Sequence, residues 1–392
     1  MKIGYSYWGF LGDKKYDSKG KLVSTPDGNA FYSWSIIDAF NRLGHEVISI
    51  MPDRDIYGWL KSGRDLFSAW CKEDRANAYE NMYKTRYEGF SDRDILHAFD
   101  NYISDVDLVV IEWRFEIVGR NDKATEMMYN IGDKELTWQP DFKIQCMLLN
   151  YCNENNIPFV VFDLDYKLTI GDVRDYNIKY IIELGNKWTK ESLVNCSCKQ
   201  VKIPFCTKHL NDIPISSTTK GNIVYVGNRY ERDWCIDKYI PQDMEGVKVY
   251  GNWTESGRDS KERWPNIEFG DRLQTADMPT VYNSYIATIL LAKEEYCKYS
   301  FMTARLLEAV FYGTIPFFIS EFGESTIEEY AGKYARYLTV NSKYELVEKV
   351  SMLKKMPSMR KKLLEYLRNH LSFMDSEIFV KDVLSMIYKG GK

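Results

Sequence analysis

Short, uninterrupted apolar runs recur along the chain, and segments whose apolar residues have helical spacing separate them. Clear examples are residues 107–112, 158–162 and 315–319. A run without polar alternation is typical of a parallel strand that helices cover on both faces. Regular alternation of such strands with helices predicts an α/β protein built on parallel sheets.

The runs form two series, separated by a Pro-, Ser- and Thr-containing linker over residues 204–220. The predicted strands of the first series are 2–7, 47–51, 107–112, 158–162, 179–183 and 198–203, and those of the second are 222–226, 247–250, 285–291, 315–319 and 335–340. Since 392 residues exceed one ordinary core, we expect two domains, 1–204 and 221–375. Residues 376–392 are expected to hold one more helix, over 377–388, which packs back on the first domain.

The intervening segments have helical patterns. The predicted helices are 31–43, much of 60–102, 142–155, 301–312, 325–331, 343–355 and 357–371. Gly44 is expected to end the first of them as a C-cap. The polar loop 8–29 follows the first strand, at the edge of a doubly wound sheet where ligands bind.

Composition narrows the class of protein. Apolar residues at 45% and charged residues at 28% predict a folded globular chain, and no apolar run approaches the roughly 20 residues that span a bilayer. The eight cysteines lack zinc-site spacing, which favours reduced thiols in a cytosolic protein. Because the first residues already read as a strand, we expect neither a signal peptide nor a membrane anchor. The net charge of −4 argues against an all-over basic coat but leaves room for a local basic groove.

One candidate site follows the first strand of the second domain. Gly227 ends this strand, and Arg229 and Arg232 come directly after it, with Asn228 between them and the glycine. A glycine lets a ligand approach the backbone, and two arginines can grip a diphosphate. The alternative is a loop whose arginines are simply solvated.

A second motif lies at the start of the predicted helix 301–312. Ser300 is a plausible N-cap, which would present free N–H groups to an anion. Arg305 and Glu308 are three residues apart and share a helix face, where the arginine can neutralise phosphate and the glutamate can accept from ribose hydroxyls. The alternative is an ordinary ion pair on a helix surface. The apolar neighbours Leu306 and Leu307 predict a buried helix, in which a glutamate without partners would be costly.

Candidate catalytic residues end strands of the first domain. Asp163 and Asp165 follow the apolar run 158–162, and such a carboxylate can deprotonate an acceptor hydroxyl. The alternatives are a strand-end aspartate that caps a loop, or a metal-binding pair. Trp113, Arg114 and Arg120 follow the run 107–112, and they are candidates for stacking on a base or sugar and for contacting phosphates. An aromatic packing cluster with solvated arginines is the alternative.

The second domain resembles the bacteriophage DNA β-glucosyltransferases, which transfer glucose from UDP-glucose to 5-hydroxymethylcytosine in duplex DNA. The resemblance lies in residues 224–229, 249–252, 264–270, 278–282, 301–308 and 334–346, whose order and spacing are kept over 222–365. The first domain matches more loosely, at 25–32 and 162–168.

The resemblance implies the GT-B fold, two Rossmann-like domains that face each other across a cleft, with the last helix crossing back. It implies a UDP-sugar donor, UDP-glucose or a UDP-pentose, with a divalent metal allowed but not required. The implied donor-binding residues are Gly227, Arg229, Arg232 and Arg305 around the phosphates, Glu308 at the ribose, and Phe269 and Met278 beside the uracil. Asn228 and Ser300, from the two motifs described above, are further donor-binding candidates. Asp165 is the better-aligned general base, ahead of Asp163.

Three hypotheses follow. The first is a phage-type glycosyltransferase in the host cytoplasm, which acts on a hydroxymethylated pyrimidine flipped out of double-stranded DNA. The second keeps the fold but transfers to a glycan, a lipid-linked sugar or a small molecule. The third is a nucleotide-binding module without a working base. The identity of the sugar, the stereochemistry and the oligomeric state stay open.

Overall fold

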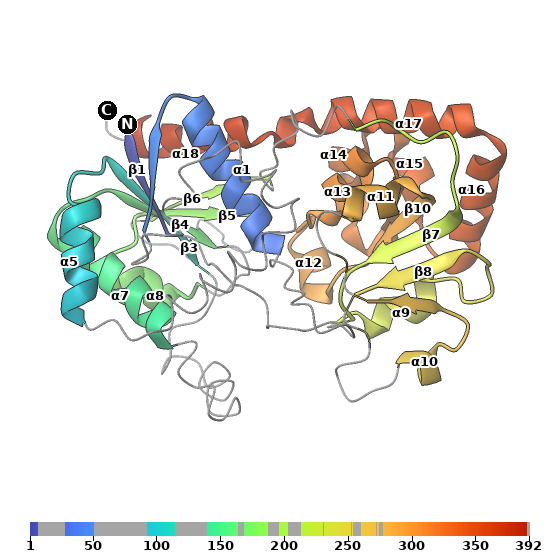
Figure 1. Ribbon diagram of the computed structural model, residues 1–392, viewed down its shortest axis with the longest axis horizontal. Coiled ribbons are helices and arrows are strands. Elements are labelled where there is room, and N and C mark those ends of the chain that lie inside the picture. The colour runs from blue at the N-terminus through green and yellow to red at the C-terminus, as the bar shows by residue number, and fades with distance from the viewer. Residues whose placement is uncertain are drawn as a thin grey trace. The chain divides into compact units, whose positions relative to one another are not determined.

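The computed structural model describes residues 1–6, 28–50, 92–113, 139–163, 168–186, 196–202, 213–229, 231–251, 253, 260–271, 273 and 277–389. The chain divides into two compact units. One unit comprises Met1–Pro204 together with Ser376–Lys392, and the other comprises Phe205–Asp375. Each unit has a parallel sheet with helices on both faces, so the predicted α/β fold class is confirmed (Figure 1).

The first sheet has six parallel strands in the order β2-β1-β3-β4-β5-β6. The strands are β1 (Lys2–Ser6), β2 (Glu46–Ser49), β3 (Leu108–Trp113), β4 (Phe159–Asp163), β5 (Tyr180–Glu183) and β6 (Ser197–Gln200). The central strands β3 and β4 are buried along their whole length. Their continuous apolar runs therefore reflect helices packed on both sides.

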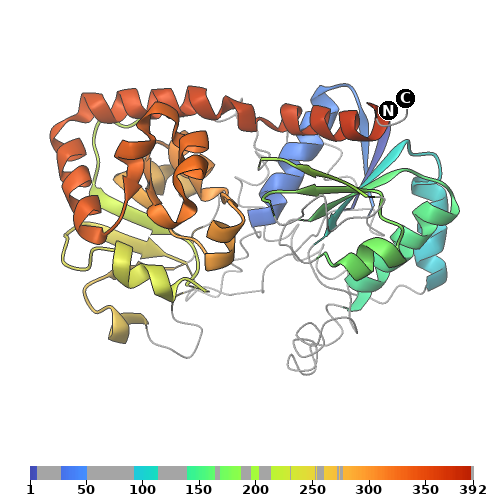
Figure 2. The same cartoon turned by 180° about the vertical axis from the view of Figure 1, so that it is seen from behind.

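Alternate residues of these strands face different helices. The helices are α1 (Gly28–Arg42), α5 (Asp92–Tyr102), α7 (Gln139–Glu154) and α8 (Ile170–Asp175). Val161 of β4 packs in one core cluster with Phe99 of α5 and Leu148 of α7. The next residue, Phe162, faces the opposite way, and its ring centroid lies 5.3 Å from that of Phe379 in the C-terminal helix. This helix lies beside the helix Gly28–Arg42 (Figure 2).

Helix α18 (Ser376–Lys389) supplies Phe379 and belongs to the first unit, although the whole second unit precedes it in sequence. It packs along α1, where Arg42 Nη1 lies 2.5 Å from Glu377 Oε1. Farther along the helix, Asp382 accepts from Lys199 Nζ at 2.7 Å. Helix α1 itself ends before Gly44, whose φ of +81° makes it the predicted C-cap.

The second sheet also has six parallel strands, in the order β12-β11-β10-β7-β8-β9. The strands are β7 (Gly221–Val226), β8 (Val247–Tyr250), β9 (Glu268–Gly270), β10 (Tyr285–Leu290), β11 (Ile315–Ile319) and β12 (Thr339–Val340). In sequence terms this is the doubly wound order 3-2-1-4-5-6, which reverses between β7 and β10. Ligands of such sheets bind at the carboxyl ends of the strands beside that reversal.

Nine α-helices surround this sheet in the described part of the second unit. They are α9 (Asp233–Tyr239), α10 (Ser260–Arg263), α11 (Met278–Asn283), α12 (Glu294–Lys298), α13 (Arg305–Tyr312), α14 (Glu324–Ala331), α15 (Ala335–Leu338), α16 (Lys343–Lys355) and α17 (Pro357–His370). Among the helices of the described ranges, none is long and apolar enough to cross a membrane.

One predicted strand of this unit is corrected, and one observed strand has no predicted counterpart. The strand expected over 335–340 is helical at Ala335–Leu338, and only Thr339–Val340 pair with the sheet. Alanine, arginine and leucine are strong helix formers, whereas β-branched residues favour strands. The three-residue strand β9 has no sequence pattern of its own, and its pairing with β8 creates it.

Candidate functional site

The best-formed candidate site lies at the carboxyl end of β7, beside the reversal of the second sheet. Gly227 follows β7, and α13 begins against it with Arg305. Arg305 Nε donates to the carbonyl oxygen of Val226 at 2.6 Å, and its guanidinium lies 5.5 Å from the Tyr225 ring centroid. A Cβ atom at position 227 would lie 2.5 Å from Arg305 Nη2, so glycine is needed where the guanidinium crosses the backbone.

Glu308 is one turn further along the same helix and is half-buried. Burial raises the pKa of its carboxyl group to about 7, and the nearby Arg305 and Tyr282 only partly offset this rise. A carboxylate in this setting lacks the solvation that it has in water, and hydroxyl donors from a ligand would supply what is missing. The two residues predicted to act together are thus brought together at one end of the sheet.

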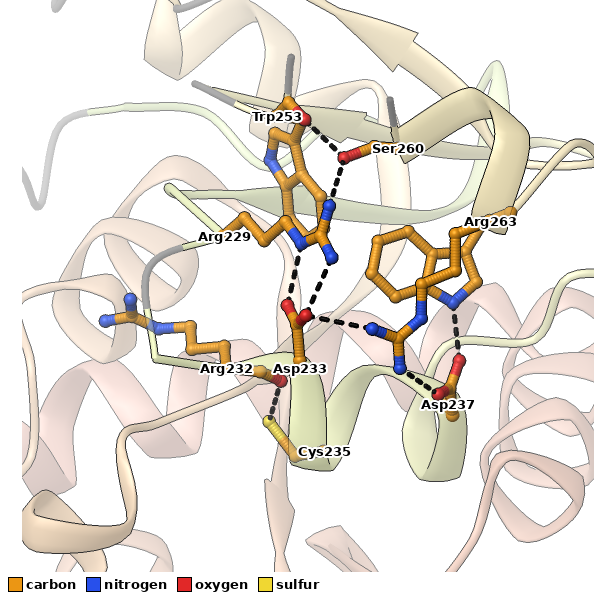
Figure 3. Close-up of polar contacts among 9 residues, drawn as sticks. Arg229, Arg232, Asp233, Cys235, Asp237, Trp253, Ser260 and Arg263 are labelled. Carbon is orange, nitrogen blue, oxygen red and sulfur yellow. Dashed lines mark hydrogen bonds and ion pairs between the residues drawn. The ribbon is translucent and has the colours of Figure 1, made fainter. Parts of the chain in front are cut away.

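Arg229 is held by protein groups (Figure 3). Its Nε and Nη2 donate to the two carboxylate oxygens of Asp233, each at 2.7 Å, and Nη1 donates to Ser260 Oγ at 3.2 Å. The guanidinium also lies 4.7 Å from the ring centroid of Trp264. Only 7% of Arg229 is exposed, so the solvated-loop alternative does not describe it. A bidentate pair of this kind fixes the loop that follows β7.

The network continues at Trp264. Arg263 lies 4.6 Å from the centroid of the indole ring, so both guanidinium groups contact this ring. Arg263 also donates to Asp233 at 2.9 Å and to Asp237 at 2.8 Å, and the Trp264 indole N–H donates to Asp237 at 2.5 Å. Two carboxylates of α9 are in this way tied to α10 and to the turn after it.

Arg232 stands at the N-cap position of α9 and is 5% exposed. Its Nη1 is 3.4 Å from the carbonyl oxygen of Asn228, while the Asn228 side chain is exposed. Cys235 Sγ lies 3.2 Å from the Arg232 carbonyl oxygen (Figure 3). Arg232 therefore contacts the backbone of Asn228, near the start of the segment that follows β7.

Two further predicted residues connect to this loop in different ways. Phe269 packs against Trp253 with ring centroids 5.5 Å apart, and the Trp253 indole N–H donates to the Gly227 carbonyl oxygen at 2.8 Å. Met278 is half-buried at the first position of α11, the helix that carries Tyr282. Phe269 is thus connected to Gly227 through Trp253. Met278 lies one helical turn before Tyr282, which adjoins Glu308.

The predicted N-cap role of Ser300 is wrong. Helix α13 begins at Arg305 with Ala304 at the N-cap position, five residues after Ser300. Ser300 has a left-handed φ of +56°, and its hydroxyl accepts from Thr326 Oγ1 at 3.0 Å. The turn that follows α12 therefore determines its conformation, and its contact with a donor stays a prediction.

In the first unit, the described candidates end buried strands. The Asp163 carboxylate is fully buried and accepts from the backbone N–H of Leu168 at 3.3 Å, which is the loop-capping geometry named as the alternative. Trp113 is likewise fully buried in the core cluster of α5 and α7, as the packing alternative requires. The other first-unit candidates, Arg114, Arg120 and Asp165, lie outside the described residues.

Two other buried acids lie on the neighbouring strands. Glu183 of β5 is the register partner of Asp163, whereas Glu112 of β3 is paired with Phe162 and accepts from the Tyr5 hydroxyl at 2.7 Å. Within the described ranges, no three His, Cys, Asp or Glu side chains are grouped as a metal ion would require. The six cysteines that the structure describes are free thiols, and Cys71 and Cys206 lie outside it.

Sequence reasoning missed three residues of the site. Asp233 holds Arg229, Tyr282 adjoins Glu308, and Trp253 binds the Gly227 carbonyl. Only Asp233 had a usable signal, because an aspartate four residues after an arginine suits an ion pair at the start of a helix. The other two reach the site through packing between distant segments.

No protein-family model and no curated protein sequence matches this chain. Solved structures do. The β-glucosyltransferase of phage T4 in complex with its UDP-glucose substrate is 14% identical, with a TM-score of 0.60 over 99% of both chains. The same enzyme in complex with UDP and Mn²⁺ is 14% identical, with a TM-score of 0.59 over 99% of both chains. An α-glucosyltransferase in complex with UDP and a 13-mer DNA containing an HMU base is 13% identical, with a TM-score of 0.59 over 99% of both chains. The chain has the fold of these GT-B glucosyltransferases along its whole length.

Proposed function

We propose that this chain is a glycosyltransferase that moves a sugar from a UDP-sugar to a hydroxymethylated pyrimidine base in DNA. The observation that carries the proposal is the group formed by Gly227, Arg305 and Glu308 at the switch point of the second sheet. It combines a guanidinium over bare backbone with a carboxyl group whose pKa is raised to about 7. The fold shared with DNA-modifying and DNA-bound glucosyltransferases favours a DNA acceptor.

The proposed donor contacts follow from the chemistry of these groups. Arg305 and Arg232 neutralise the diphosphate, with backbone groups around Gly227 and Asn228 allowing close approach. Glu308 accepts hydrogen bonds from the ribose hydroxyls, and Phe269 and Met278 border the uracil. Arg229 joins the phosphate contacts only if it exchanges its Asp233 partner, so its first role is to hold the loop.

The proposed reaction is a displacement at the anomeric carbon. The Asp165 carboxylate takes the proton of the acceptor hydroxyl, whose oxygen forms the new bond to the anomeric carbon. The bond from that carbon to the β-phosphate oxygen breaks, and UDP leaves with the electron pair. The arginines stabilise the negative charge that develops on the diphosphate. Asp163, which accepts from the Leu168 N–H, precedes Asp165 by two residues and is proposed as a positioning residue.

The acceptor contacts belong to the first unit. Arg114 and Arg120 follow β3 in sequence and are proposed to contact DNA phosphates, which predicts binding that weakens steeply with salt. A glycan, lipid-linked or small-molecule acceptor is the second candidate, and the net charge of −4 favours it. Binding to DNA at low salt with a strong salt dependence separates the two.

A panel assay tests the function directly. Hydroxymethylcytosine DNA, unmodified DNA and no DNA are each incubated with several UDP-sugars, with and without a chelator, and nucleosides are read by intact mass. We expect a sugar-sized mass gain on the modified DNA alone, which Glu308→Ala and Asp165→Asn each abolish. Release of UDP without DNA dependence would move the proposal to the second acceptor class. If no donor gives a mass gain or UDP release although the protein binds UDP, the result would favour a nucleotide-binding module.

A further inference from the structure

Helix α17 carries two arginines, the buried Arg360 and the half-buried Arg368, whose guanidinium groups bind backbone carbonyl oxygens. Arg360 donates to Ser216 at 2.8 Å and to Gly313 at 2.6 Å. Arg368 donates to Ile213 at 2.9 Å, to Phe311 at 2.7 Å and to Val310 at 3.2 Å. Burial lowers the pKa of both arginines, so desolvation of the two cations is offset by these carbonyls.

Three of these five carbonyls belong to the end of α13. Val310 and Phe311 lie in its last turn, and Gly313 is its C-cap. The last carbonyls of a helix have no partner inside it, and a cation there also suits the helix dipole. We call the contacts of Arg360 and Arg368 with these carbonyls the clamp. Because α13 has eight residues, about 12 Å of helix separates the clamp from Arg305 at the other end. A helix this short is rigid, so holding its C-terminal end also holds its N-terminal end in place.

The remaining carbonyls belong to the segment that leads from the first unit into β7. Residues 213–216 of this segment run alongside α17 (Figure 1). Asn283 binds the segment as well, because its Oδ1 accepts from the Ser216 N–H at 2.8 Å and its Nδ2 donates to Pro214 at 2.8 Å. Asn283 directly follows Tyr282, the phenol that adjoins Glu308, and the Tyr282 carbonyl in turn accepts from the Thr314 hydroxyl.

We infer that Arg360, Arg368 and Asn283 are positioning residues for the donor site. They tie residues 213–216 to α13, which carries Glu308, and to the end of α11, which carries Tyr282 beside it. UDP affinity therefore depends on these side chains although none of them reaches the donor. The inference rests on the proposed function, since it takes UDP as the ligand of Arg305 and Glu308.

The clamp requires the planar, multi-donor guanidinium group of arginine. One planar group with several N–H donors can hold carbonyls of two separate segments at once, whereas a lysine ammonium is a point charge on a flexible stem. The clamp thus predicts that lysine restores the charge but only part of the positioning. A role in stability alone would instead lower the unfolding midpoint and leave ligand affinity of the folded protein unchanged.

The experiment uses the full chain with Arg360→Gln, Arg368→Gln, Arg368→Lys and, as a matched control, Lys362→Gln on the exposed face of the same helix. UDP is titrated calorimetrically, well below the unfolding midpoint of each variant. We expect both glutamine variants to weaken UDP binding by about fivefold, equivalent to about 1 kcal/mol. Arg368→Lys should lie between them and the wild type, and Lys362→Gln should match the wild type. Unchanged UDP affinity in folded glutamine variants would overturn the inference.

Amide hydrogen exchange of the same proteins decides the question independently of any ligand. In Arg368→Gln we expect faster exchange over Arg305–Tyr312 and Met278–Asn283 and no change in β11. Unchanged exchange over Arg305–Tyr312 and Met278–Asn283 would also overturn the inference. If the wild type itself fails to bind UDP, the proposed function falls, while the exchange data still test the clamp.

Discussion

The guanidinium of Arg305 lies directly over Gly227, with Nη2 2.5 Å from the place where a Cβ atom would stand. Gly227→Ala therefore displaces the arginine from the Val226 carbonyl. Since the colliding atoms are the end of a flexible side chain, we expect a small change in the unfolding midpoint. UDP affinity should fall at least as far as in Arg305→Gln, as measured by titration calorimetry.

Gly251 provides the contrast. Its φ is +138°, and an added Cβ would stand 2.3 Å from the Gly227 carbonyl oxygen, which is backbone and cannot swing away. Gly251→Ala should thus lower the unfolding midpoint far more than Gly227→Ala. Equal thermal shifts in the two variants would mean that Gly227 is needed for folding and not for the placement of Arg305.

Because of Glu308, we expect UDP affinity and the stability of the folded protein to change with pH in opposite directions. Its pKa is raised to about 7 in the folded protein, so the neutral form favours folding. The contribution of Glu308 to stability is present below its unfolded pKa of about 4.5 and is lost as the pH rises through about 7. Ribose hydroxyls instead need the ionised acceptor, so UDP affinity should rise over the same interval. Glu308→Gln should flatten the part of both profiles that this carboxyl causes, and a wild-type-like pH profile of UDP binding in that variant would contradict the ribose role.

The Arg229–Asp233 pair separates a loop-holding role from a phosphate-binding role. Arg229→Gln removes a bidentate, mostly buried ion pair, and we expect a loss of about 2 kcal/mol in the free energy of unfolding by urea denaturation. Asp233→Asn weakens the same pair from the other side and keeps the guanidinium. If Arg229 only holds the loop, the two variants should weaken UDP binding to a similar extent. A much larger loss in Arg229→Gln would place its guanidinium on the donor.

Asp163, the last residue of β4, and Asp165 should respond differently to removal of their charge. Asp163→Asn keeps an oxygen acceptor for the Leu168 N–H, and we expect a shifted unfolding midpoint with at most about a tenfold loss of kcat. Asp165→Asn, in the role of general base, should lower kcat by about 10² or more and leave UDP affinity unchanged. Single-turnover transfer to modified DNA measures both, and the reverse ranking would make Asp163 the base.

Sequence pattern was sufficient where burial is uniform. The runs in β3, β4 and β11 are apolar throughout because both faces of these strands are covered, and each was predicted within a residue or two. The same pattern fails at Ala335–Leu338, where the apolar content of the segment predicts a strand although its residues favour a helix.

The candidate site was predictable only in part. Arg305 and Glu308 share a helix face by their spacing alone, and the structure places them together beside Gly227. The Arg229–Asp233 pair has a four-residue spacing that the sequence shows, but the contact of Arg229 with Trp264 depends on a fold that brings α10 to α9, which spacing along the chain does not encode. For the same reason, the raised pKa of Glu308 could not be read from its neighbours in sequence.

The return of α18 to the first unit has a consequence for biosynthesis. A ribosome that has made residues 1–375 has already produced every strand of both sheets, yet Phe162 still lacks Phe379, and Arg42 lacks Glu377. The second unit, continuous in sequence, can complete its fold during translation, while the earlier-made unit waits for the last helix. A released fragment of residues 1–375 should therefore protect the later-made half from protease and leave the earlier half sensitive.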